Sequence, residues 1–206
     1  MSAGEQPTVF VVDDDEAVRD SIAELAESVG LAPRCYPSAT AFLDDVKPDS
    51  HGCLVLDVRM AGMSGLALQQ HLSDRGSHLP IIMVTGHGDV PMAVEAMRNG
   101  ALDFIQKPYR EQTLLDSINA ALVVDARNRR SRGADHSLRT RLATLTEREM
   151  EVFDCLRCGD SSKAIARKLD ISPRTVESHR HNLLHKMGVA SVNELLVLLA
   201  GQEFDD

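Results

Sequence analysis

The sequence predicts an α/β domain built on a doubly wound, five-stranded parallel sheet, followed by a second, smaller all-α domain. In residues 8 to about 124, short β-branched apolar runs alternate with segments of helical periodicity, which is typical of successive βα units. Beyond residue 144 the strand-like runs stop and helical patterns remain. The chain has 206 residues, which is enough for two domains of ordinary size.

Five strands are expected in the first part of the chain. Each is a short apolar or β-branched run, and helical stretches separate them. The predicted strands cover residues 8–12, 32–36, 53–56, 81–84 and 103–106. Apolar strands that are joined by crossover helices indicate a parallel sheet with both faces covered.

The helices between these strands are expected to begin near Glu16, Ser38, Ser64, Pro91 and Glu111. In the first helix, one apolar stripe repeats with helical spacing and comprises Val18, Ile22, Leu25, Ala26 and Val29. Gly30 and Gly100 are expected to end the first and fourth helices, because glycine adopts the left-handed conformation that closes many helices.

The boundaries predicted from these patterns are 1–124 for the first domain, 125–143 for a linker and 144–206 for the second domain. The linker sequence is polar, rich in arginine and interrupted by Gly133, so we expect it to be partly helical and its arginines to be solvated.

The second domain carries clear helix-start signals. Thr146 and Glu149 fit a capping box, and Gly159 is expected to close the helix that follows. The remaining helices are predicted over 162–169, after Ser172 as N-cap with Pro173 in the first position, and over 192–200. Two short helices that are joined by a tight turn, the second of them basic, indicate a helix-turn-helix.

Charge is distributed unevenly along this acidic chain, whose net charge is −9. Residues 1–124 carry 8 Lys and Arg against 18 Asp and Glu, whereas residues 125–206 carry 14 against 13. Within 161–187, six basic residues face two acidic ones. A confined basic patch in an acidic protein indicates contact with a polyanion such as DNA.

The sequence disfavours a membrane-spanning protein and a structural zinc site. The longest apolar stretches, 81–84 and 195–200, are far shorter than the roughly 18 residues that a membrane span needs. The first residues show no signal-peptide pattern, so we expect a cytoplasmic protein with reduced cysteines and no membrane partner. Cys155 and Cys158 form one C-x-x-C without a second pair, and are interpreted as helix cysteines.

Polar residues follow four of the five predicted strands. Asp13 and Asp14 come after the first, Asp57 after the third, Thr85 after the fourth and Lys107 after the fifth. In a parallel sheet these ends share one edge, which is where ligands bind. Three carboxylates would repel one another there unless a hard cation such as Mg²⁺ lay among them. A carboxylate can also attack phosphorus to give an aspartyl phosphate.

The residues resemble the receiver domains of bacterial two-component response regulators over positions 8 to about 122. The motifs are "VVDDDEAVR", "LVLDVRMAGMSG" and "MVTGHGDVPMAVEAMRNGALDFIQKP". Together with "LTEREMEVF" and "KAIARKLDISPRTVESHRHNLLHKM", the whole chain is similar to FixJ-type regulators with a LuxR-type DNA-binding domain. The resemblance implies a flavodoxin-like, CheY-like receiver with strand order 2-1-3-4-5.

The resemblance also implies roles for the residues at the acidic edge. Asp57 would accept a phosphoryl group from a sensor histidine kinase, and Lys107 and Thr85 would contact that group. Thr85 and Phe104 would form the switch, and the Lys107-Pro108 bond would be cis. The implied ligands of Mg²⁺, with Mn²⁺ or Ca²⁺ as substitutes, are Asp13, Asp14, Asp57 and the backbone carbonyl of Arg59. Ala61 stands where these domains usually carry proline, so we expect a looser loop there.

In the predicted helix after Ser172, the apolar residues Leu183, Leu184 and Met187 fall on the side of Val176, which is expected to pack. The other side is expected to face the groove of DNA. The candidate DNA contacts are Lys163, Arg174, Thr175, Glu177, Ser178, His181, Asn182, His185 and Lys186. His181 and His185 lack a third metal ligand, so a metal reading is disfavoured.

These inferences predict a phosphorylation-controlled transcription factor rather than an enzyme. Phosphorylation of Asp57 would alter the surface around the fourth helix and fifth strand and promote a homodimer. The dimer would bind double-stranded DNA at two-fold related half-sites and act with RNA polymerase. Two alternatives stay open: an aspartate-nucleophile phosphatase, which Val58 and Arg59 disfavour because no second acid follows Asp57, and DNA binding that is independent of phosphate.

Overall fold

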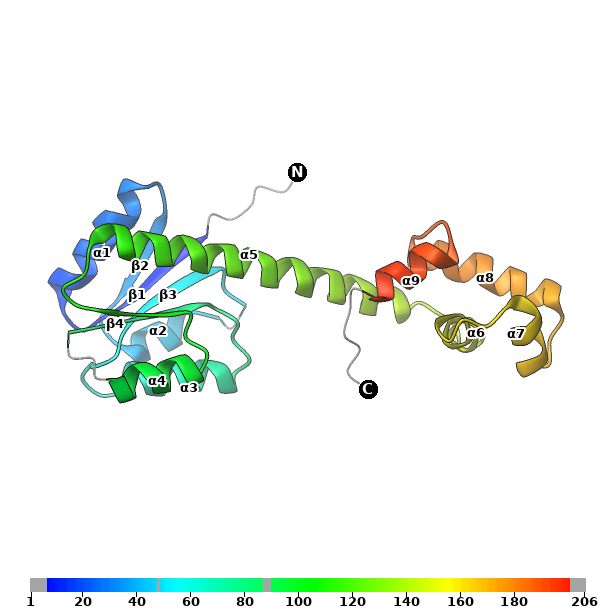
Figure 1. Ribbon diagram of the computed structural model, residues 1–206, viewed down its shortest axis with the longest axis horizontal. Coiled ribbons are helices and arrows are strands. Elements are labelled where there is room, and N and C mark those ends of the chain that lie inside the picture. Colours follow the sequence, from blue (N-terminus) through cyan, green and yellow to red (C-terminus); the bar gives the residue numbers. More distant parts are fainter. Residues whose placement is uncertain (1–6, 48, 87–89, 201–206) are drawn as a thin grey trace. The chain divides into compact units, whose positions relative to one another are not determined.

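The computed structural model describes residues 7–47, 49–86 and 90–200 and divides into two compact units, Met1–Arg129 and Arg130–Asp206 (Figure 1). The division falls inside helix α5 (Glu111–Leu142). The residues predicted as a linker are therefore helical through Leu142, and the helix continues past Gly133. Leu138 is buried in the core of the second unit.

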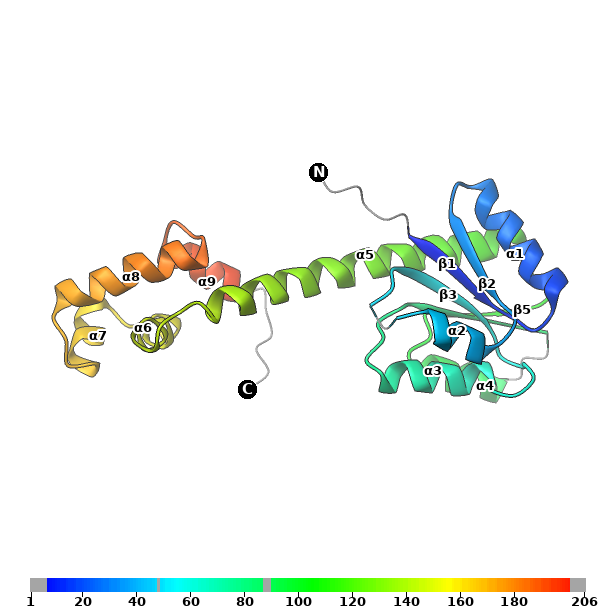
Figure 2. The same cartoon turned by 180° about the vertical axis from the view of Figure 1, so that it is seen from behind.

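The first unit contains one parallel sheet of five strands. These are β1 (Thr8–Val12), β2 (Ala32–Tyr36), β3 (Gly52–Asp57), β4 (Ile81–Thr85) and β5 (Asp103–Gln106). Their order is β2-β1-β3-β4-β5, which confirms the predicted doubly wound topology. Figure 2 shows β1 between its neighbours β2 and β3. The register pairs Val12 with both Tyr36 and Leu56, so β1, β2 and β3 end at the same edge of the sheet.

Helices cover both faces of the sheet because its central strands, β1, β3 and β4, are buried on both sides. Helices α1 (Glu16–Ser28) and α5 pack on the face that carries Val9 and Val11. On the opposite face, α2 (Ala39–Asp45), α3 (Gly65–Asp74) and α4 (Val90–Arg98) pack against the side of Phe10 (Figure 1). Complete burial of large side chains such as Phe42, each contributing roughly 2 kcal/mol, holds these layers together.

Local capping explains where these helices begin and end. Asp15, Ser38 and Ser64 accept hydrogen bonds from the first turns of α1, α2 and α3. Gly30 and Gly100 follow α1 and α4 with positive φ, as the sequence predicted. Residues 87–89 lie outside the described part of the chain, and α4 is described from Val90.

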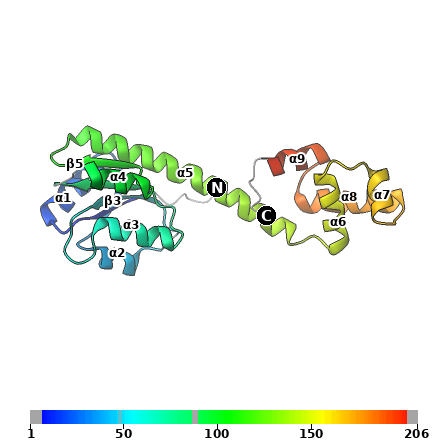
Figure 3. The ribbon, with the colours of Figure 1, turned by 60° about the horizontal axis from the view of Figure 1, so that its bottom comes forward.

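The second unit consists of the end of α5 and four further described helices, α6 (Glu147–Arg157), α7 (Ser162–Lys168), α8 (Pro173–Met187) and α9 (Val192–Ala200) (Figure 3). The capping box of Thr146 and Glu149 is present, and Ser172 caps α8 with Pro173 in its first turn. The core of this unit lies between the helices and includes Phe153, Ile165 and Leu183. No helix in the described ranges is both long and apolar enough to cross a membrane.

Candidate functional site

The parallel register brings four polar residues to one edge of the sheet. Asp13 directly follows β1, Asp57 ends β3, Thr85 ends β4 and Lys107 directly follows β5. The backbone N–H of Lys107 donates to the carbonyl of Thr85 at 2.8 Å, which extends the β4–β5 ladder to the site. Thr85 is 1% exposed, so its side chain is enclosed at this edge.

The ammonium group of Lys107 joins two buried carboxylates. Its Nζ lies 2.7 Å from Oδ2 of Asp13 and 3.0 Å from Oδ1 of Asp57. Asp13 and Asp57 are 3% and 6% exposed, so water screens their mutual repulsion poorly. The predicted meeting of Asp57, Lys107 and the acidic residue after β1 is therefore present in the structure.

Burial and charge act in opposite directions on this cluster. Burial raises the pKa of Asp57 and the nearby Asp13 adds to the rise, while Lys107 and the backbone N–H of Arg59 lower it; the net shift is upward. For Lys107, burial lowers the pKa, but the hydrogen bonds and charges of Asp13 and Asp57 outweigh burial and raise it. The lysine thus stays charged, whereas ionised Asp57 remains incompletely compensated.

Asp14 departs from the predicted gathering of three carboxylates. Its side chain is exposed, and its Oδ2 accepts a hydrogen bond from the backbone N–H of Ala61 at 3.1 Å. Across the described residues, no three Asp, Glu, His or Cys side chains are arranged to hold a metal ion. Ala61 has the backbone N–H that a proline would lack, and this N–H holds the Asp14 carboxylate in the structure.

The loop after β3 fits closely around Asp57. The N–H of Arg59 donates to Oδ2 of Asp57 at 2.6 Å, and the N–H of Gly65 donates to the carbonyl of Val58 at 2.9 Å. A Cβ at Gly65 would lie 2.2 Å from the carbonyl oxygen of Asp57, so no other residue fits there without a backbone shift. The start of α3 is thereby held against the backbone of Asp57.

Phe104 is partly buried on β5 and packs against the core that includes α3 and α4. The Lys107-Pro108 peptide bond is cis, as the resemblance implied.

Sequence reasoning missed Gly65 and Arg19, whose guanidinium donates to the carbonyl of Asp13 at 2.8 Å. Arg19 could have been found from its position one helical turn after the acidic run, where it faces the end of β1.

Helix α8 separates its buried and exposed sides as predicted. Val176, Leu183 and Met187 are buried. Most of the candidate DNA contacts are exposed, namely Lys163, Arg174, Thr175, Glu177, Ser178, His181, Asn182 and His185. Their exposure leaves one side of α8 accessible to a partner.

Two basic residues of α8 have partners inside the second unit. Lys186 lies 2.6 Å from Oε2 of buried Glu149 and also donates to the carbonyl of Thr144 at 3.0 Å. Arg180 is bonded to Ser162 and lies 3.0 Å from Glu177. Lys186 therefore joins α8 to α6, a role that sequence reasoning did not assign to it.

The comparisons with known proteins identify the family. Residues 9–119 match the family model described as response regulator receiver domain, and residues 143–199 match that of bacterial regulatory proteins, luxR family. The chain is also 49% identical to the transcriptional regulatory protein FixJ of Azorhizobium caulinodans over 94% of this chain and 92% of that protein. This chain belongs to the response regulators.

Two further relatives cover nearly all of this response regulator. The transcriptional regulatory protein TdiR of Thauera aromatica is 48% identical over 94% of the chain and 85% of its own length. The solved structure of the response regulator StyR is 42% identical, covers 96% of this chain and 100% of its own, and superposes with a TM-score of 0.88. The chain is thus a transcription-regulating response regulator with a LuxR-type DNA-binding domain, and not an enzyme.

The raised pKa of Asp57 gives this response regulator a pH-dependent stability. Because the folded-state pKa lies above the ordinary value of 3.8, ionisation of Asp57 lowers stability as the pH rises from 3.8 through that pKa. Asp57→Asn removes this ionisation. Its free energy of unfolding should match that of the wild type near pH 3 and exceed it at pH 7.

Urea denaturation at several pH values measures this difference. Asp44→Asn removes an exposed carboxylate and serves as the control for net charge. A wild type that gains stability over Asp57→Asn as the pH rises would contradict the raised pKa.

Proposed function

We propose that Asp57 accepts a phosphoryl group from the phosphohistidine of a sensor histidine kinase in a Mg²⁺-dependent reaction, and that this promotes dimerisation and DNA binding. The observation that carries the proposal is the buried Asp13–Lys107–Asp57 cluster at the strand edge. Its support is geometric, because nucleophile and cation lie within hydrogen-bond distance of each other.

In this reaction a carboxylate oxygen of Asp57 forms a bond to phosphorus while the bond from phosphorus to the histidine nitrogen breaks. The electron pair of that bond leaves with the imidazole. Lys107 neutralises charge on the phosphoryl oxygens, and Thr85 donates a hydrogen bond to one of them. Lys107 is held for this role by Asp13, which also keeps it charged.

The carboxylate and carbonyl oxygens at the edge are the kind of donor that Mg²⁺ prefers, with Mn²⁺ or Ca²⁺ as substitutes. Asp13, Asp57 and the carbonyl of Arg59 would hold the ion directly, and Asp14 would act through water once released from Ala61. When bound, the ion supplies positive charge to the transferring phosphoryl group. Two buried carboxylates, Asp13 and Asp57, lie at this edge, and a cation beside them would stabilise their ionised forms.

We infer that phosphorylation acts through Thr85 and Phe104 on the surface of α4 and β5. Helix α4 carries large apolar side chains in the open: Val90 is 77% exposed, Val94 43% and Met97 48%. An apolar surface of this kind is typical of a protein–protein contact. It supports a homodimer formed through α4.

The paired second domains would then bind DNA at two-fold related half-sites, with the exposed side of α8 in the major groove. The candidate phosphate contacts are Lys163, Arg174, Thr175 and Lys186, and the candidate base contacts are Glu177, Ser178 and His181; Asn182 and His185 lie on the same side. Glu177 is bonded to Arg180, so it needs to exchange this partner to reach a base.

We propose RNA polymerase as a further partner. Bacterial DNA lies in the cytoplasm, so we also propose that this DNA-binding protein is cytoplasmic. We also propose functional boundaries of 1–124 for the receiver, 125–143 for the connecting helix and 144–206 for the DNA-binding domain. Residues 125–129 pack with the first unit, which places the structural division slightly later than the functional one.

Phosphorylation of Asp57 can be tested with ³²P-labelled acetyl phosphate. The wild type with Mg²⁺ should acquire one acid-stable, alkali-labile label, and Asp57→Ala should acquire none. Lys107→Arg keeps the charge but not the geometry, so its labelling rate should fall by about tenfold. Equal labelling of Asp57→Ala and wild type would overturn the proposal.

The contact between Ala61 and Asp14 predicts a measurable effect on Mg²⁺ affinity. Ala61→Pro removes the N–H that holds the Asp14 carboxylate, so the affinity should rise by about fivefold, since a hydrogen bond of this type contributes roughly 1 kcal/mol. Isothermal titration of the full chain with Mg²⁺ measures the change. Ala61→Val keeps the N–H and should bind like the wild type, and a weaker affinity in Ala61→Pro than in Ala61→Val would count against this account.

Dimerisation through α4 predicts that a charge introduced on α4 weakens the dimer, whereas one introduced on α5 does not. Light scattering should show a dimer when the full chain is activated with beryllofluoride and Mg²⁺. Met97→Glu places a charge on the apolar surface of α4 and should weaken the dimer by at least about tenfold. Val123→Glu alters an equally apolar exposed residue of α5 and should leave the dimer intact. The reverse result would assign the interface to α5.

A further inference from the structure

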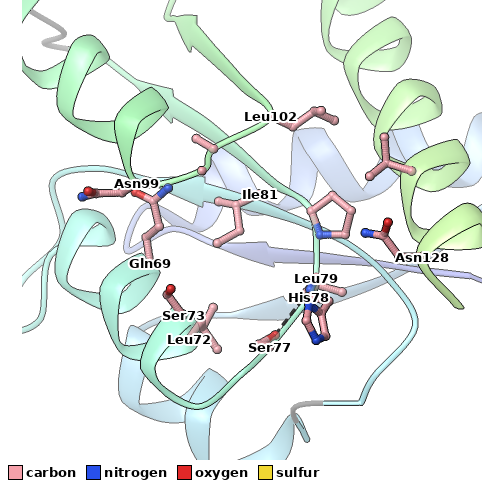
Figure 4. A pocket seen from close by; sticks show the side chains of 14 residues that line it. Gln69, Leu72, Ser73, Ser77, His78, Leu79, Ile81, Asn99, Leu102 and Asn128 are labelled. Carbon is pink, nitrogen blue, oxygen red and sulfur yellow. Dashed lines mark hydrogen bonds between the residues drawn. The ribbon is translucent and has the colours of Figure 1, made fainter. Parts of the chain in front are cut away.

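Helix α5 contributes to both units, but it packs differently in each. In the first unit, Val124 and Asn128 of α5 line a cavity of about 380 Å³ where β4 and β5 begin (Figure 4). In the second unit, Leu138 is 2% exposed, and Leu142 packs against the same core. The last turns of α5 are therefore a fixed part of the unit that carries α8.

The C-terminal end of α8 is closed by two kinds of contact. Gly188 follows the helix with a φ of 64°, and its N–H donates to the carbonyl of His185 at 3.1 Å. The carbonyl of Met187, the last residue of α8, instead accepts a hydrogen bond from Nη1 of Arg141 at 2.8 Å. A cation at this end of a helix also meets the negative end of the helix dipole, which is a favourable arrangement.

The guanidinium of Arg141 fits closely against the turn that ends α8. A Cβ at Gly188 would lie 3.1 Å from Nη1 and 3.6 Å from Cζ of Arg141. A side chain at this position would therefore press on the guanidinium. Gly188 thus supplies both the left-handed conformation that ends the helix and the space that Arg141 occupies.

A second bond joins the same two segments in the opposite direction. Nζ of Lys186, in the last turn of α8, donates to the carbonyl of Thr144 at 3.0 Å. Oγ1 of Thr144 in turn donates to the carbonyl of Arg141 at 2.6 Å. The end of α5 and the end of α8 are therefore joined by two cationic side chains, one from each segment.

We propose that Arg141 is a positioning residue for DNA recognition, because it holds the C-terminal end of α8 against α5 and so fixes how the exposed side of α8 meets the base edges. The inference rests on the proposed binding of α8 in the major groove. Base contacts carry the sequence information and need side chains that are held to within about 0.5 Å, whereas phosphate contacts carry none. A displaced α8 therefore loses discrimination between sequences.

The test compares two DNA probes with the full chain activated by beryllofluoride and Mg²⁺. The first probe is a duplex that the wild type selects from a random-sequence pool, and the second is a random-sequence duplex of the same length. The affinity for the first divided by that for the second measures specificity at one salt concentration. All measurements are made at a temperature at which circular dichroism shows every variant folded, so a loss of stability alone leaves this ratio unchanged.

Three variants separate position from charge. Arg141→Met removes the donors and should lower the specificity ratio by at least about fivefold, since a base contact contributes roughly 1–3 kcal/mol of discrimination. Arg141→Lys keeps a cationic donor on a long side chain and should restore the ratio to within about twofold. Arg139→Met removes the same charge from an exposed position of the same helix and should leave the ratio unchanged.

The ¹³C chemical shift of the Met187 carbonyl reports the contact itself. It should move in Arg141→Met, because the carbonyl loses its donor, and it should stay near the wild-type value in Arg141→Lys and Arg139→Met.

An unmoved carbonyl shift or an unchanged ratio in Arg141→Met would overturn the proposal. An equal loss of affinity for both duplexes would also overturn it, because it would make Arg141 a phosphate contact. The same fall of the ratio in Arg139→Met would assign the effect to charge and reject positioning. Failure of the wild type to select any duplex would instead reject the proposed DNA contact of α8, on which this inference rests.

Discussion

The ammonium group of Lys107 is the constraint on which the acidic site depends. It lies within 3.0 Å of oxygens from both Asp13 and Asp57, and these two carboxylates are almost fully buried. Without Lys107 the two carboxylates would share a poorly screened space as unpaired like charges, and leaving buried charge uncompensated in this way destabilises by roughly 3–5 kcal/mol. Because the three residues follow or end β1, β3 and β5, the site exists only if all three strands keep their register.

The second unit also contains a lysine–carboxylate pair, Lys186 and Glu149, but there the pKa of the carboxyl group is lowered. Burial raises the pKa of Glu149, but the hydrogen bonds from Lys186 and from Thr146 outweigh burial and lower it overall. The net pKa of Asp57 is raised instead. Glu149 fixes α6 against α8, and its hydrogen bonds outweigh its burial, whereas at Asp57 burial outweighs the hydrogen bonds from Lys107 and Arg59. The difference arises because Asp57 lies beside a second buried carboxylate, Asp13, which raises its pKa further, whereas Glu149 accepts hydrogen bonds from both Lys186 and Thr146.

Local pattern was sufficient for the strands, the helices and the position of the acidic residues at the strand ends, whereas the strand order and the roles of those residues came from the resemblance to receiver domains. The strands are apolar on both faces, so their limits differ by at most a residue at either end from the predicted ranges. The two main departures depend on contacts that no local pattern contains. Asp14 bonds to Ala61 across 47 positions, and α5 continues past Gly133 because Leu138 is buried in the second unit, which offsets the helix penalty of about 1 kcal/mol for glycine.

The basic patch of residues 161–187 also shows a difference between the sequence pattern and the contacts in the structure. Composition alone counts six Lys and Arg side chains there, all of them candidates for contact with a polyanion. In the structure, Lys168, Arg180 and Lys186 each have a carboxylate partner within their own unit, at 2.6, 3.0 and 2.6 Å. Lys163, Arg167 and Arg174 are exposed. Lys168, Arg180 and Lys186 would each have to exchange a carboxylate partner before they contact a phosphate and add a released counterion to the salt dependence of DNA binding.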